Sequence, residues 1–123
     1  MSKLLSIVPL ALLATTDAYA QALDGTYKGE RTTTGGKGDI QYCGTIPSSR
    51  PASFTVKGDT ISGGNWSSKI APDGTFIMKG TLNNRDQDVM TITGKITGAT
   101  LQAKWETPGV RATCWGEYTA QRS

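Results

Sequence analysis

The chain has 123 residues, carries a formal net charge of +3 at pH 7 and contains no histidine. Its basic residues are scattered, and because nucleic-acid-binding surfaces usually need clustered lysine and arginine, we expect no nucleic-acid partner. The lack of histidine excludes imidazole-based triads and removes the commonest ligand of zinc and haem sites, so we expect no metal site and no cofactor.

Residues 1–20 are organised like a secretory signal peptide. A short start with Lys3 precedes an apolar stretch over residues 4–14, which is too short for a bilayer span of about 20 residues. Ala18 and Ala20 are the small residues of an A-x-A cleavage site. The sequence therefore predicts cleavage after Ala20, a single domain over residues 21–123, and a periplasmic or secreted location. No later segment is apolar enough to span a membrane as a helix.

Both cysteines of the chain, Cys43 and Cys114, belong to the predicted exported part. An even pair in an exported protein predicts a disulfide bond. This bond would enclose most of the domain, and the chain-entropy treatment gives it about 4 kcal/mol of stabilisation. Such a contribution matters here because large aliphatic residues are few and small cores need additional support.

The exported part is rich in Thr and Ile and poor in Leu, which favours strands over helices. Turn signals separate the alternating segments, and they lie at Gly58-Asp59, Pro72-Asp73-Gly74, Asn83-Asn84, Thr97-Gly98 and Pro108-Gly109. We expect about eight strands, over residues 24–32, 39–46, 52–57, 60–70, 75–82, 88–96, 99–106 and 111–120.

The fold class predicted from these segments is all-β, an antiparallel meander. Short connections favour closure into an up-and-down barrel, and a two-sheet sandwich is the alternative. In a barrel, the first strand would separate Cys43 from Cys114 by about twice the strand spacing. The disulfide therefore counts against an ideal barrel unless Cys43 lies at a rim or in a loop.

Three aromatic residues are candidates for a ligand-binding surface. Strand alternation places Trp105 with Leu101 in the core, whereas Trp115 points away from the interior if Cys114 faces inward. An indole left in water suggests a cover, which is either a loop of this chain or a ligand. We therefore predict a binding surface that includes Trp115, with Trp66 and Tyr27 as further contributors.

The segment Asn83–Asp88 is rich in side-chain oxygens. It lacks the glycine and the bidentate glutamate of an EF-hand loop, so a solvated hairpin loop is favoured over a calcium site. Asp86 and Asp88 form a carboxylate pair, but nothing in their spacing supports glycosidase chemistry.

Two segments carry a resemblance to a known class of proteins. The opening Leu23–Gly29 (LDGTYKG) and the closing Cys114–Tyr118 (CWGEY) resemble those of small, signal-bearing, two-cysteine periplasmic β-domain proteins of Gram-negative bacteria. The first strand is also similar to the Gly-Thr-aromatic opening of avidin, but the ligand-binding residues of avidin are not matched, so no biotin site is implied. Small periplasmic inhibitors of lysozyme or proteases are similar in size and compartment, although no inhibitory motif is shared.

Export, a disulfide-bonded β scaffold and the lack of catalytic residues favour a non-catalytic binding module of the bacterial envelope or secreted space. Its partner would be a small molecule, a glycan or a protein. The alternative is an inhibitor that presents a hairpin loop, over residues 83–88 or 107–110, to a secreted or host hydrolase such as lysozyme or a protease. The third hypothesis, an enzyme, is the least favoured.

Overall fold

The computed structural model describes residues 23–64, 66–81, 89–109 and 111–123. The predicted signal peptide and the predicted loop at residues 83–88 lie outside these ranges. No helix of the described part is long and apolar enough to cross a membrane. The elements are β1 (Gly25–Gly38), the 3-10 helix η1 (Ile40–Cys43), β2 (Ser48–Lys57), β3 (Thr60–Gly63), β4 (Trp66–Lys69), β5 (Thr75–Thr81), β6 (Val89–Thr97), β7 (Thr100–Pro108) and β8 (Ala112–Arg122).

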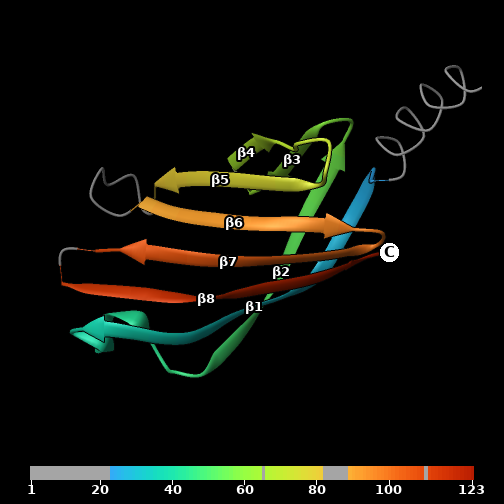
Figure 1. Ribbon diagram of the computed structural model, residues 1–123. Helices are drawn as coiled ribbons and strands as arrows, with labels where there is room; N and C mark the ends of the chain where they lie inside the picture. The colour runs from blue at the N-terminus through green and yellow to red at the C-terminus, as the bar shows by residue number, and fades with distance from the viewer. Residues whose placement is uncertain (1–22, 65, 82–88, 110) are drawn as a thin grey trace, which may run out of the picture.

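The strands form one antiparallel sheet in the order β4-β3-β2-β1-β8-β7-β6-β5. Strands that follow one another along the chain are paired, except for β4 and β5 at the two ends of this order, and the last strand, β8, pairs with the first, β1 (Figure 1). The predicted all-β meander is confirmed. Its eight strands belong to a single, nearly closed, barrel-like sheet and not to two packed sheets.

The two edges of this sheet meet along a seam between β4 and β5. An isolated antiparallel bridge joins Ile70 to Phe76, and the N–H of Ala71 donates to the carbonyl of Thr75 at 2.8 Å. Farther along, Ser68 Oγ donates to the carbonyl oxygen of Ile77 at 2.7 Å. These contacts join the two edges and satisfy part of the hydrogen-bonding capacity that exposed sheet edges carry.

Side-chain alternation divides each long strand into an inner and an outer face. On β8, every second residue from Ala112 to Ala120 is buried, and Trp115 is exposed between Cys114 and Gly116. On β7, Leu101 and Trp105 are 0% and 2% exposed. The predicted inward direction of Trp105 and outward direction of Trp115 are therefore both confirmed.

The strand predicted at residues 39–46 is wrong. Residues 40–43 form η1 instead, and the second strand begins at Ser48. Gly38 and Gly44 adopt positive φ angles of 84° and 79°, which interrupt an extended chain on either side of this turn. The predicted strand at 60–70 is also divided, because the chain reverses at Gly64 (φ 59°) between β3 and β4. The predicted number of eight strands still agrees with the structure, because the strand predicted at 39–46 is absent and the one predicted at 60–70 is two strands.

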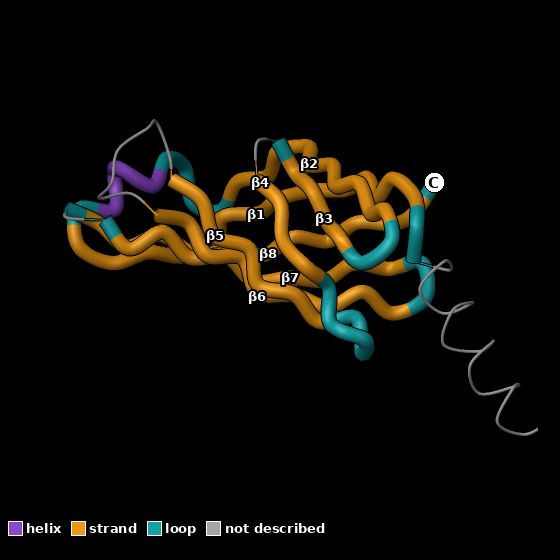
Figure 2. Tube along the Cα trace, turned by 90° about the horizontal axis from the view of Figure 1, so that it is seen from above, coloured by secondary structure: helices purple, strands orange, loops and turns teal. Residues whose placement is uncertain are grey.

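The predicted disulfide between Cys43 and Cys114 is present, with a Cα–Cα distance of 5.6 Å. Cys43 ends η1 in the loop after β1, at the end of the sheet that extends beyond β3 and β4 (Figure 2). Cys114 is paired with Gly36 of β1, and a Cβ atom on Gly36 would lie 2.8 Å from Cys43 Sγ. The loop position of Cys43, together with a glycine under the sulfur, allows the bond to pass over the first strand of a barrel-like sheet.

Candidate functional site

The structure places the three predicted binding residues in three different parts of the domain. Tyr27 is fully buried, and its hydroxyl donates to the carbonyl oxygen of Leu23 at 2.6 Å. Trp66 is half-buried at the start of β4, and Trp115 lies on the outer face of β8. Tyr27 thus belongs to the core, and Trp66 and Trp115 must be considered separately as ligand contacts.

Trp66 lines a hollow of about 320 Å³ where the β3–β4 hairpin reverses. We call it the Trp66 hollow. Its inner wall is apolar, formed by the buried side chains of Phe54, Met78 and Ile92 together with the partly buried indole. Small-molecule sites are concave and mostly apolar with a few polar groups, and this volume is at the low end of their usual range.

Glycines on both sides of the seam make room for the aromatic wall of this hollow. A Cβ atom on Gly80 would lie 2.1 Å from Cε2 of Trp66, and a Cβ atom on Gly63 would lie 2.8 Å from Cδ1 of Phe54. Phe54 also meets Tyr118 edge to face, with ring centroids 5.1 Å apart. The wall is therefore fixed by close packing, and its rings do not depend on a ligand for their positions.

Two arginines, which the sequence analysis did not select, contribute to the same hollow. Arg31 of β1 and Arg50 of β2 are directly paired across the two strands, and both line it. The alternation that places Tyr27 inward also places Arg31 inward, so the signal for this residue was present in the sequence. The described residues that line the hollow include no aspartate or glutamate.

The guanidinium of Arg31 is held against an aromatic ring. Its Cζ lies 4.2 Å from the ring centroid of Trp105, and Trp105 Nε1 donates to the carbonyl oxygen of Thr32 at 2.9 Å. The indole passes beside Gly116, where a Cβ atom would lie 2.7 Å from Nε1. This cation–π contact stabilises the charge of Arg31. It leaves the buried Nε of Arg31 without a hydrogen-bond partner among the described residues.

Tyr118 supplies a third donor on the inner face. It is paired with Arg31 across β8 and β1, and its hydroxyl donates to Met90 Sδ at 3.7 Å. A thioether is a weak acceptor, so this hydroxyl makes little use of its donor. Burial raises the pKa of Tyr118, and the positive charge of Arg31 offsets part of that rise. Tyr118 is therefore a neutral hydrogen-bond donor at neutral pH.

Trp115 belongs to a different surface. It is 36% exposed and lines an outer hollow of about 550 Å³ with Thr34, Glu106 and Lys104. A Cβ atom on Gly35 would lie 2.5 Å from Trp115 Nε1, so this glycine lets the indole pack against the strand backbone. The sequence analysis expected either a part of this chain or a ligand to cover this indole. The backbone at Gly35 covers part of it.

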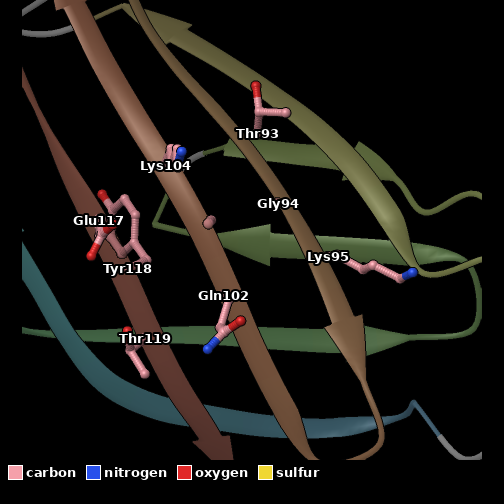
Figure 3. A pocket seen from close by; sticks show the side chains of 9 residues that line it. Thr93, Gly94, Lys95, Gln102, Lys104, Glu117, Tyr118 and Thr119 are labelled. Atoms are coloured by element: carbon pink, nitrogen blue, oxygen red, sulfur yellow. The ribbon is translucent and has the colours of Figure 1, made fainter.

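A neighbouring outer hollow of about 390 Å³ lies on the same face of the sheet. Figure 3 shows that its polar side chains stand on β6, β7 and β8, and they include Lys95, Gln102, Lys104, Glu117 and Thr119. Lys104 and Glu117 are cross-strand partners of opposite charge. This exposed surface carries charges of both signs and no tryptophan, so it is a weaker candidate than the Trp66 hollow.

Within the described ranges, no group of three or more His, Cys, Asp or Glu side chains could hold a metal ion. The possible calcium ligands at residues 83–88 are outside those ranges. Comparison of the chain with protein-family models, with curated proteins and with solved structures gave no match. The candidate site therefore rests on the geometry of the chain alone.

Proposed function

We propose that this protein is an exported, non-catalytic binding module of the bacterial envelope or secreted space, and that a small molecule occupies the Trp66 hollow. The observation that supports this proposal is the combination of an aromatic wall with under-used donors. Arg31 and Arg50 line the hollow with no aspartate or glutamate among its described residues, and the Tyr118 hydroxyl has only a thioether acceptor. Buried polar groups are nearly always satisfied, and a bound ligand is one way to satisfy them.

The Trp66 hollow is preferred to the outer face around Trp115 for a physical reason. A half-buried indole and two arginine side chains from neighbouring strands line it together. Ligand sites usually combine an apolar wall with a few polar groups that fix the orientation of the ligand. The exposed indole of Trp115 fits a second, shallower contact surface.

The test compares Trp66→Ala with Trp115→Ala in protein isolated from the periplasm of an expression host. Native mass spectrometry should detect a small-molecule adduct on the wild type and on Trp115→Ala, and the adduct should be lost on Trp66→Ala. Loss on Trp115→Ala alone would move the binding site to the outer face. A circular-dichroism melting curve for each variant separates loss of binding from loss of fold.

The inhibitor alternative has a different signature in the same material. A pull-down from periplasmic extract that retains an abundant hydrolase, with inhibition of its activity, would favour inhibition over small-molecule binding. Export has its own measurement, which is the intact mass of the secreted chain. That mass should correspond to a chain beginning at Gln21, and a chain that retains residues 4–14 would contradict export by a cleaved signal peptide.

A further inference from the structure

From the charge and the walls of the Trp66 hollow, we infer that its ligand is an organic anion, with a carboxylate or sulfonate head and a compact apolar body. The inference rests on the proposed function and specifies the class of ligand. It depends on three features of the hollow, which are a pair of opposed arginines, the fixed position of one of them against Trp105, and the half-buried indole of Trp66.

Arg31 and Arg50 are like charges at directly opposed positions of β1 and β2. Side chains at such positions share one face of the sheet, and like charges placed there destabilise the pair. Lys69 and Asp59 form an exposed ion pair, and the described residues that line the hollow include no carboxylate that could pair with either arginine. An anion bound in the hollow, which both arginines line, would make charge-assisted interactions with their guanidinium groups.

The donors of the hollow are suited to an acceptor that carries negative charge. Arg31 is held in place by Trp105, is only partly buried and lines the hollow. Tyr118 adds a neutral hydroxyl beside it. Arginine is the side chain that best matches the planar geometry of a carboxylate, and pre-positioning lowers the entropy lost on binding.

The rest of the hollow selects for an apolar body. Met78 and Ile92, at 0% and 1% exposed, are already covered by the protein, so the apolar surface open to a ligand is that of the half-buried Trp66 indole and of Ala52. Inorganic phosphate or sulfate would leave these surfaces uncovered. A compact aromatic or aliphatic group attached to the anion would cover them and contribute about 25 cal/mol for each Å² buried.

The experiment uses the exported protein and a matched pair of probes, 2-naphthoate and its uncharged isostere 2-naphthamide, with inorganic phosphate as a third probe. Tryptophan fluorescence and isothermal titration calorimetry follow binding at low and high salt. We expect 2-naphthoate to bind, with 2-naphthamide about tenfold weaker or more, which is the effect of losing charge-assisted hydrogen bonds. Binding of 2-naphthoate should also weaken with salt.

The variants separate the arginines from general effects of charge. Arg50→Gln should weaken 2-naphthoate about tenfold and 2-naphthamide much less, because the amide has no charge to pair with the guanidinium and Arg50 is exposed at the hollow. Lys28→Gln is the matched control, since it removes one positive charge from the outer face of β1 and should leave both probes unchanged. Arg31→Gln should have the larger effect on 2-naphthoate. Arg50→Gln remains decisive if Arg31→Gln unfolds.

Several outcomes would overturn the inference. They are equal binding of naphthoate and naphthamide, insensitivity of naphthoate to Arg50→Gln, binding of inorganic phosphate in place of naphthoate, or binding of none of the three probes. A Trp66-dependent small-molecule adduct that proves to be uncharged would refute the anion while leaving the proposed function intact. Absence of any Trp66-dependent adduct would count against the proposed function itself.

Discussion

The indole of Trp66 lies so close to Gly80 that a Cβ atom at residue 80 would be 2.1 Å from Cε2 of the ring. The two residues are on opposite sides of the seam, Trp66 at the start of β4 and Gly80 near the end of β5. Backbone contacts around Ile70 and Phe76 join the two edges of the sheet at one end of the seam. At the other end of the seam, the Trp66 ring packs on Gly80. This contact also sets one wall of the Trp66 hollow.

Gly80→Ala should therefore destabilise the domain and also displace the Trp66 wall of the Trp66 hollow. The new methyl group forces the indole to move, and overpacking of this kind costs about 1–3 kcal/mol. Urea unfolding gives the change in free energy, and the emission maximum of tryptophan reports the displaced ring. A double-mutant cycle isolates the cause, because Gly80→Ala should cost much less in a Trp66→Ala background. Equal costs in the two backgrounds would show that the indole is not the obstacle.

Removal of the disulfide should lower stability substantially. Cys43 and Cys114 are 71 residues apart, and the chain-entropy treatment predicts that Cys114→Ser costs about 4 kcal/mol. This is a large share of the stability of a small domain. Differential scanning calorimetry of the exported protein should show a marked fall in Tm, and Cys43→Ser should match it. Two free thiols in wild-type exported protein would contradict both the bond and this explanation of stability.

Trp105 and Trp115 should respond in opposite ways to truncation. Trp105 is 2% exposed, donates to Thr32 and supports Arg31, so Trp105→Ala should cost about 3–5 kcal/mol. Trp115 is 36% exposed, so Trp115→Ala should cost about 1 kcal/mol or less. Chemical denaturation of the two variants makes the comparison. A loss of about 3 kcal/mol or more for Trp115→Ala would show that its packing on Gly35 is part of the core.

The residues that sequence reasoning placed correctly are those governed by short-range rules. Alternation along the last strand separated Cys114 from Trp115, and Gly98 adopts the positive φ of 61° that suits a tight hairpin turn. The error at residues 39–46 arose because the 3-10 turn is fixed by long-range contacts, including the bond from Asp39 N–H to the carbonyl of Arg111 at 2.9 Å. Local propensity carries no signal for such a contact.

The candidate site was only partly predictable for a similar reason. Trp66 could be selected as an unusual residue in a polar segment, but its surroundings depend on closure of β4 against β5. Arg31 was overlooked because a charged residue on a strand is ordinarily solvated. Its inward direction becomes meaningful only when Arg50, Tyr118 and Trp105 are seen to meet it from three other strands.

Alkaline pH should destabilise the fold through Tyr27 and Tyr118. Burial raises the pKa of both side chains, opposed by the charge of Arg122 at Tyr27 and of Arg31 at Tyr118. A raised pKa means that the unfolded chain loses these protons first, near its tyrosine pKa of about 10. The associated stability is complete below that pH and is lost as the pH rises toward the folded-state pKa values.

Tyr118→Phe tests this prediction at the residue that also lines the Trp66 hollow. At pH 7 it should cost about 1 kcal/mol or less, because the hydroxyl has only a thioether acceptor. Between pH 9 and about 11 the variant should lose less stability than the wild type, since one of the two perturbed tyrosines no longer titrates. Urea unfolding across this range, with tyrosinate absorbance followed in parallel, measures both effects. Tyr27→Phe is the matched comparison, which removes a 2.6 Å hydrogen bond to Leu23 and should cost more at pH 7. An alkaline loss in Tyr118→Phe as steep as in the wild type would contradict the burial of an unionised Tyr118 beside Arg31.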